Sequence, residues 1–265
     1  MASDSPWGGN GTEGKGRSII DVVGPWDVGG RSFWTGDSAY GNFQGTSNAT
    51  PHVAGLALVF YDMYEQVTGS QYLNMNPGQM FAWMLATADR YMGSIGAKRG
   101  WGTDNRSGLG RARGRMFNAA GLDYPAYWWN YYTCIEEGET YYSLNLGTLL
   151  ASTNDVKAVV WWYDPRIEQG LDPDDVDLEI WKDGVLAKVS QSRTDNKEMA
   201  MHSVTSGVNY NITLKIKGYD VDGDDSGCGQ NSLKVYVAAM AEDSARDDGD
   251  GPTYSASTCL GVEPM

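Results

Sequence analysis

Residues 45–55, GTSNATPHVAG, run directly into the apolar segment LALVFYDMY of residues 56–64. A glycine and small hydroxyl residues before an apolar run are typical of a turn that leads into a helix. The apolar residues between positions 50 and 67 cover most of a helical circumference, which predicts a helix in the middle of a core. Ser47 would lie where this helix begins. Either Thr46 or Ser47 caps the helix, or Ser47 acts as a nucleophile beside the free backbone N–H groups.

The composition narrows the classes of function. The chain has 265 residues, of which 41% are hydrophobic, enough for one large domain or two ordinary ones. No apolar run is long enough to cross a membrane, so we expect no membrane partner. A net charge of −14 argues against nucleic acid and suits the binding of divalent cations. The first twenty residues lack the order of a secretory signal, so the chain is either cytosolic or its leader is absent.

The pattern of residues changes near positions 122–132. Before this point, residues 19–23 (IIDVV) predict a buried strand, and Asn76 and Pro77 predict the start of a second helix. A third, shorter helix is expected over residues 114–120. After this point, short β-branched and aromatic runs alternate with turn residues, and Asp183-Gly184 indicates a hairpin.

These patterns predict a fold class and three segments. An α/β region covers residues 1–125, an all-β sandwich or jelly roll covers residues 131–241, and an acidic flexible tail covers residues 242–265. The Trp pairs 128–129 and 161–162 indicate packing, with sugar stacking as the alternative. Three cysteines, Cys134, Cys228 and Cys259, allow one disulfide, and their spacing does not select the pair.

The string GTSNATPHVAG closely resembles the nucleophile motif of the subtilisin-like serine proteases, G-T-S-x-A-[ST]-P-H-V-A-G. IIDVVGPWDV before it, and NPGQMFAWMLATA and WGTDNRSGLGRARGRMFNAA after it, resemble neighbouring segments of that family. The resemblance covers residues 17–121 and implies the C-terminal part of a subtilisin-like α/β fold. Further on, DVKAVVWWYDP and DVDLEIWKDG resemble the β-sandwich that follows the catalytic domain in many secreted members. This second resemblance, to secreted members, therefore implies an extracellular protein.

The resemblance also implies the chemistry. Ser47 would attack the carbonyl of a peptide bond, or of an ester, and form an acyl-enzyme, with its own backbone N–H as half of the oxyanion hole. Thr46 would shape the turn, Gly45 would let the backbone approach the peptide or polymer substrate, and Tyr40 would lie near the specificity pocket.

The base that Ser47 requires is harder to assign. The family supplies its aspartate and histidine from the part of the fold that precedes Ile19, where this chain has no histidine. His52 belongs to the motif in a structural role and lies about 140° around the helix from Ser47. His202 falls on a predicted strand, and only an unexpected docking would bring it to Ser47.

We therefore expect the C-terminal portion of a subtilase, completed by a second chain or by self-association. The alternative is a catalytically silent pseudo-enzyme or a module whose aromatic-rich sandwich binds protein or polysaccharide.

Two acidic segments are candidates for Ca²⁺. Asp220, Asp222 and Asp224 alternate on a turn, a spacing that lets several carboxylates converge. Asp172, Asp174, Asp175 and Asp177 crowd a second loop. The ordinary alternative for both is a solvated acidic turn.

Overall fold

The computed structural model describes residues 21–25, 27–31, 40–69, 75–88, 109–110, 112, 127–138, 142–149, 153–165, 173–203, 209–222, 228–229 and 231–243. The chain divides into two compact units, residues 1–59 with 88–113, and residues 60–87 with 114–265. The segment boundaries expected from the sequence stay a prediction. The helix expected at 114–120 and the tail beyond residue 243 lie outside the described residues.

In the first unit a short hairpin and a single bridge precede the serine. Strands β1 (Asp27–Arg31) and β2 (Tyr40–Gln44) pair antiparallel. Upstream, the Val23 N–H donates to the Gly110 carbonyl and the Ala112 N–H donates to the Val23 carbonyl, each at 2.9 Å. This exchange is that of a parallel bridge. The end of the predicted strand 19–23 is therefore paired, and the larger α/β fold stays a prediction.

Helix α1 (Thr46–Thr68) begins four residues earlier than the apolar pattern predicts. The Gly45 carbonyl accepts hydrogen bonds from the N–H groups of Asn48 at 3.0 Å and Ala49 at 3.1 Å, which makes Gly45 the N-cap. The expectation that this helix lies in the middle of a core is wrong for part of its length. Leu58 is 70% exposed and Val59 is 40% exposed, whereas Phe60 is fully buried.

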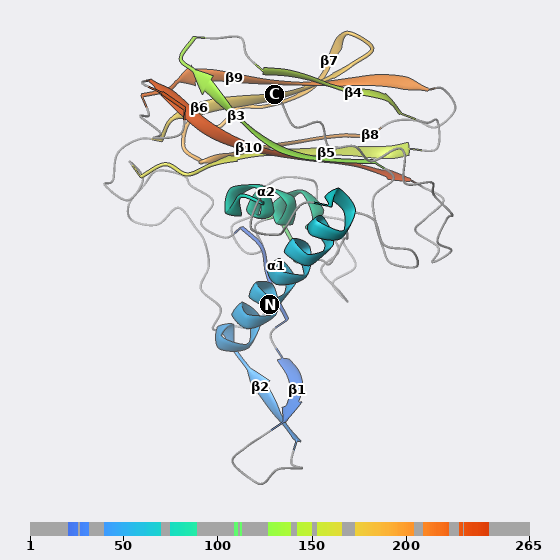
Figure 1. Cartoon of the computed structure of the whole chain (residues 1–265), viewed down its shortest axis with the longest axis vertical. Helices are drawn as coiled ribbons and strands as arrows, with labels where there is room; N and C mark the ends of the chain where they lie inside the picture. The colour runs from blue at the N-terminus through green and yellow to red at the C-terminus, as the bar shows by residue number, and fades with distance from the viewer. Residues whose placement is uncertain are drawn as a thin grey trace. The chain divides into compact units, whose positions relative to one another are not determined.

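The second unit is mostly β and contains two four-stranded antiparallel sheets, which lie one above the other in Figure 1. Their strand orders are β3-β10-β5-β8 and β4-β9-β6-β7. Residues from both sheets form one continuous buried core, so the sheets pack face to face. The strands are β3 (Tyr127–Glu136), β4 (Tyr142–Leu149), β5 (Thr153–Trp162), β6 (Asp175–Lys182), β7 (Val185–Ser190), β8 (Lys197–Ser203), β9 (Tyr210–Asp220) and β10 (Ser232–Asp243).

Period-two alternation explains how the side chains of β9, an inner strand of its sheet, are placed. Along β9, buried residues alternate with partly exposed ones, so Ile212, Leu214 and Ile216 all face the core. The hairpin predicted at Asp183-Gly184 is confirmed: β6 pairs with β7, and both turn residues have positive φ, 50° and 79°.

Helix α2 (Pro77–Thr87) begins as the sequence predicts. The Asn76 side-chain oxygen accepts a hydrogen bond from the Gly78 N–H at 3.1 Å, which confirms Asn76 as the N-cap. In return, the Gln79 side-chain oxygen accepts the Asn76 N–H at 3.1 Å. Two backbone donors at the helix start are thus satisfied reciprocally, as in a capping box.

Helix α2 lies along the outer face of the sheet that contains β10 and β5 (Figure 1). The Phe81 ring lies 4.8 Å from Trp161 between centroids, and Trp83 lies 6.1 Å from Trp128. The Asn130 amide donates to the Gln79 carbonyl at 3.0 Å. Trp83 is fully buried and Trp128 nearly so, which confirms the packing interpretation of the Trp128 side chain.

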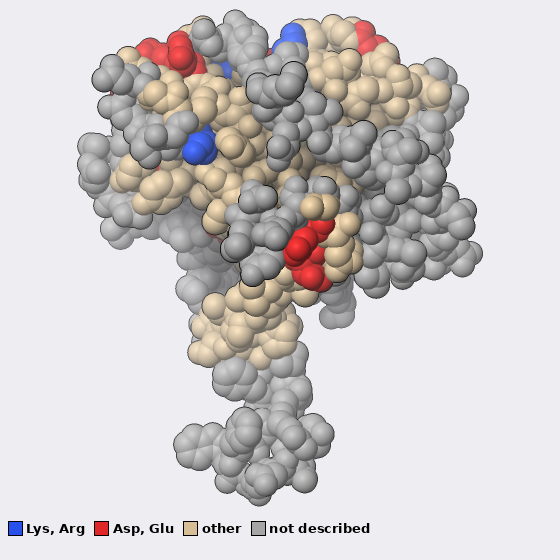
Figure 2. Space-filling model, in the orientation of Figure 1, with Lys and Arg blue, Asp and Glu red and all other residues tan. Residues whose placement is uncertain are grey.

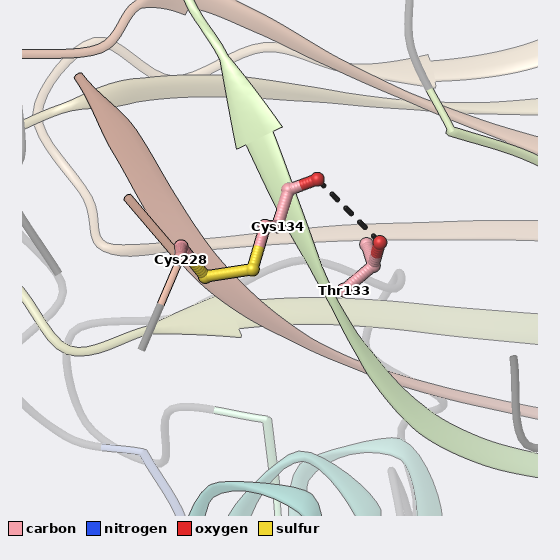
Figure 3. Close-up of a disulfide and its surroundings, with 3 residues drawn as sticks. All are labelled: Thr133, Cys134 and Cys228. Atoms are coloured by element: carbon pink, nitrogen blue, oxygen red, sulfur yellow. Dashed lines mark hydrogen bonds between the residues drawn. A yellow bond between two sulfur atoms is a disulfide. The ribbon is translucent and has the colours of Figure 1, made fainter. Parts of the chain in front are cut away.

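Figure 3 shows the disulfide, which joins Cys134 on β3 to Cys228 just before β10. The two Cα atoms lie 5.5 Å apart, and the bond closes a sequence separation of 94 residues. Beside it, the Thr133 hydroxyl donates to the Cys134 carbonyl at 3.5 Å. The structure therefore selects one of the pairs that the sequence left open, and Cys259 lies outside the described residues.

Candidate functional site

Ser47 is the second residue of α1, and its side chain is exposed. Because Gly45 is the N-cap, the interpretation of Ser47 as the cap itself is wrong. The first residues of a helix have no carbonyl four positions back within the helix for their N–H groups, and the positive end of the helix dipole lies there. Ser47 therefore has two properties that a nucleophile needs: access to a substrate and a neighbourhood that stabilises negative charge.

Two residues, Gly45 before Ser47 and Pro51 after it, determine the shape of this turn. Gly45 has φ of 99°, a conformation that residues with a side chain rarely adopt. Pro51 lies inside the helix and has no N–H, so it cannot bond to the Ser47 carbonyl as an ordinary residue four positions on would. The first turn depends instead on the two bonds to the Gly45 carbonyl and on the bond from the Thr50 hydroxyl to the Thr46 carbonyl at 2.9 Å.

Asn48 is a residue whose role the sequence did not reveal, because it occupies the variable position of the motif. Its side chain is 1% exposed and donates from the amide nitrogen to the Pro25 carbonyl at 3.1 Å. A Cβ placed on Gly24 would lie 2.9 Å from the Ala49 carbonyl oxygen and 3.1 Å from a Val53 methyl group. The backbone of residues 21–25 thus packs directly against the first turns of α1, and Asn48 fixes the contact.

His52 bonds to its own helix. Its Nδ1 lies 2.7 Å from the Asn48 carbonyl oxygen, so this nitrogen carries the proton and donates. The exposed ring keeps Nε2 as its acceptor. This contact is consistent with the structural role expected for His52, and its assignment as the base stays a hypothesis.

The remaining residues expected at the site are described only in part. Thr46 is the first residue of α1 and is exposed. Tyr40 begins β2 and pairs with Arg31 in the register, and its side chain lies outside the description. His202 is half-buried on β8, opposite Val156 of β5. Burial, and to a lesser degree Lys182, lowers the His202 pKa, whereas Asp155 raises it.

The two acidic segments, which the sequence treats separately, meet in the structure at one end of the β6–β9 pair. Asp175 and Asp220 are opposite each other in the register. The Asp222 N–H donates to an Asp174 carboxylate oxygen at 2.8 Å, and the Asp174 N–H donates to Asp164 at 2.6 Å. Asp220 and Asp222 are exposed, and Asp224 lies outside the described residues.

Two buried carboxylates near this end, Asp175 and Asp177, have raised pKa values. Burial raises the pKa of Asp175, with Asp177 and Asp220 adding to the effect and Arg193 opposing it. Burial also raises the pKa of Asp177, which accepts a hydrogen bond from the Gln191 amide at 3.1 Å. Among the residues that the structure describes, no three His, Cys, Asp or Glu side chains are grouped closely enough to hold a metal ion.

Glu198 on β8 is a second residue that sequence analysis missed. It is 1% exposed and accepts a hydrogen bond from the Ser190 hydroxyl of β7, a strand of the other sheet. The same hydroxyl accepts the Met199 N–H at 3.2 Å. Burial raises the pKa of Glu198 to about 8, against the hydrogen bonds from Ser190 and Ser192. Nothing in the strand KEMAMHS marks this residue, because its burial depends on the partner sheet.

On the face shown in Figure 2, acidic side chains of the described residues stand in separate small groups, with a few basic side chains between them. Neither of the two helices that the structure describes is long and apolar enough to cross a membrane.

Comparisons with known proteins bear mainly on residues 24–110. No curated protein matches the chain at a significant level. Yersinia pseudotuberculosis-derived mitogen is 13% identical with a TM-score of 0.29, covering 49% of this chain and 97% of that one. A carbohydrate-binding module, CBM36, in complex with calcium and xylotriose is 11% identical with a TM-score of 0.23, covering 41% and 78%. PorU from Porphyromonas gingivalis is 12% identical with a TM-score of 0.19, covering 52% and 15%. These scores support no argument about function.

The Subtilase family model matches residues 24–110, which include Ser47, and this part of the chain is therefore subtilase-like.

Proposed function

We propose that this chain is a serine hydrolase of the subtilase type, which cleaves peptide bonds, and esters as a side activity, through an acyl-enzyme on Ser47. The observation that carries the proposal is an exposed serine in the first turn of a helix, after a glycine N-cap, within the segment 24–110 that matches the subtilase family. The hydroxyl attacks the carbonyl carbon, and the N–H groups of the helix start stabilise the oxyanion that forms. Gly45 and Thr46 shape the approach, and Tyr40 contacts the substrate.

The base comes from a partner. We propose that a second chain, or a second copy of this one, supplies the aspartate and histidine and packs on the apolar side of α1. Leu58 and Val59 are exposed at neighbouring positions of α1 and give such a partner an apolar surface to pack on. Without a base the serine remains a poor nucleophile, so the chain alone is a weak hydrolase.

The location and the cofactor follow from the second unit. We propose that the protein is extracellular, because disulfides such as Cys134–Cys228 persist in oxidising compartments. The strand orders β3-β10-β5-β8 and β4-β9-β6-β7 support a jelly-roll topology. We also propose Ca²⁺ as a cofactor, held by the acidic segment that contains Asp220, Asp222 and Asp224, since Ca²⁺ prefers carboxylate and carbonyl oxygens.

The proposal competes with a binding function. Three tyrosines of the second unit, Tyr132, Tyr163 and Tyr219, are 46%, 55% and 51% exposed. Exposed aromatic rings stack on sugars and pack against proteins, so a catalytically silent module that binds protein or polysaccharide is the second candidate.

A fluorophosphonate probe separates the two candidates. The folded chain is treated with the probe, and any adduct is located by mass spectrometry, with Ser47→Ala as the test variant and Ser203→Ala, another exposed serine, as the control. Because the chain alone lacks its base, we expect a slow adduct on Ser47 that disappears in Ser47→Ala and persists in Ser203→Ala. A chain that keeps its folded circular dichroism spectrum and takes up no label at Ser47 even after prolonged treatment with excess probe would overturn the hydrolase and favour the module.

A further inference from the structure

The two acidic segments form one site through β-sheet pairing. Asp175 at the start of β6 is opposite Asp220 at the end of β9, and directly opposed residues have their Cβ atoms about 4.5–5.5 Å apart. The register shifts just after this pair, between Asp175 and Val176. Two like charges are therefore held face to face at the end of a sheet, an arrangement that destabilises the pair unless something neutralises it.

One oxygen of this pair lacks a partner. Asp175 is 7% exposed, and its Oδ1 is buried without a hydrogen bond among the residues that the structure describes. Its Oδ2 lies 3.8 Å from Nε of Arg193, whose side chain is 78% exposed. A buried carboxylate oxygen with no donor costs free energy that native proteins usually avoid. The exposed guanidinium of Arg193 compensates the charge at Oδ2 of Asp175, and within the described part of the chain Oδ1 has no such compensation.

The surrounding charges increase this need for a positive group. Asp177 lies two residues along β6 from Asp175, and Asp220 is opposite Asp175 in the register, so both carboxylates place negative charge near it. Asp177 has its own compensation, since it accepts from Gln191 and is opposite Lys217 in the register. Asp175 is compensated at one oxygen by the exposed Arg193, which leaves its buried Oδ1 facing this negative charge.

We infer that Asp175 and Asp220 together bind one hard divalent cation, Ca²⁺, through the buried Oδ1 of Asp175 and the exposed carboxylate of Asp220. This inference rests on the proposed use of Ca²⁺ and names its ligands, with Asp175 in place of Asp222 and Asp224 as the central residue. A cation there satisfies the buried oxygen and removes the repulsion between the opposed carboxylates.

The site is a weak one. Ca²⁺ takes six to eight oxygen ligands, and two carboxylates supply only part of that set, with water and backbone carbonyls as the remainder. Because no three metal-binding side chains are grouped among the described residues, the protein contributes few side-chain ligands. A dissociation constant of roughly 0.1–1 mM, the range of extracellular Ca²⁺ modules, is expected.

The test uses the full chain, titrated with CaCl₂ by calorimetry and followed in parallel by thermal unfolding. At 5 mM Ca²⁺ we expect the unfolding midpoint to rise by roughly 3–6 °C. Asp175→Asn removes the shift and weakens binding at least tenfold. Asp62→Asn, the same change of charge at an exposed carboxylate on α1, keeps both. Asp220→Asn, at an exposed position, repeats the loss if Asp175→Asn does not fold.

The possible results are distinct. A shift in the wild type that both Asp175→Asn and Asp220→Asn retain would overturn the ligand assignment and leave the proposed use of Ca²⁺ intact. No heat of binding and no shift in the wild type up to 10 mM CaCl₂ would overturn both. Neither result bears on labelling of Ser47, which tests the hydrolase separately.

Discussion

The serine segment at the start of α1 and the two-sheet body formed by β3 to β10 are specified by sequence in different ways. In the serine segment, residues 45–55 match the family motif at every fixed position, yet Thr46, Ser47 and Thr50 are exposed. In the two-sheet body no short string is diagnostic, yet residues of both sheets form one buried core. The identity of single residues thus determines chemistry, and the pattern of apolar residues determines stability.

The largest expected effect that separates the two regions is a dependence of the free energy of unfolding on pH, which arises in the two-sheet body. Glu198 holds its proton in the folded state up to a pKa of about 8, whereas its ordinary value is 4.5. A raised folded-state pKa stabilises the fold below the ordinary pKa, and this contribution is lost as pH rises through the folded-state value. We expect the free energy of unfolding to fall by on the order of 3 kcal/mol between these two pH values.

Glu198→Gln tests this expectation, because glutamine stays neutral at every pH. Urea unfolding of the variant should lose this slope between pH 4.5 and pH 8. Glu136→Gln, at an exposed position on β3, should keep the wild-type slope. Equal slopes for wild type and Glu198→Gln would show that Glu198 is ionised in the folded protein.

A pair of helical glycines, one in each region, gives the next largest effect. A Cβ on Gly78 would lie 2.4 Å from a ring carbon of Tyr236, whereas a Cβ on Gly55 would have nothing within 4 Å. Gly78→Ala should therefore lower the free energy of unfolding by about 1–3 kcal/mol, because α2 has to shift on its sheet. Gly55→Ala should raise it by about 0.5–1 kcal/mol, since alanine favours the helix. Denaturant unfolding of both variants measures the contrast, and a Gly78→Ala protein as stable as Gly55→Ala would contradict the packing of α2.

Much of the fold could be predicted because its signals are local. The hairpin at Asp183-Gly184 depends on two residues that adopt positive φ, and the start of α2 depends on the side chain of Asn76. The contact of α2 with its sheet could not be predicted, since it joins Trp83 to Trp128 across residues with no common pattern. The disulfide partner of Cys134 is likewise decided by which strands become neighbours.

The candidate site shows the same division. The motif identified Ser47, Thr46 and Gly45 by residue type, and these residues lie together at the start of one helix. Asn48 and Glu198 were missed because their roles depend on tertiary burial, against residues 21–25 in one case and against β7 in the other. The acidic segments were found but kept separate, because only the β6–β9 register brings Asp175 to Asp220.

The smallest expected effect concerns how firmly the serine segment is held. Asn48→Ala removes the donor to the Pro25 carbonyl, a bond of 3.1 Å, and should cost about 1 kcal/mol. Because this bond ties residues 21–25 to α1, the Val23 amide should exchange with solvent deuterium roughly fivefold faster. Thr50→Ala removes a hydroxyl bond within α1 alone and should leave Val23 unchanged. If both variants exchange alike at Val23, the turn that presents Ser47 is held by the packing of Gly24 against Ala49 and Val53, and the polar side chain of the motif's variable position has no part in it.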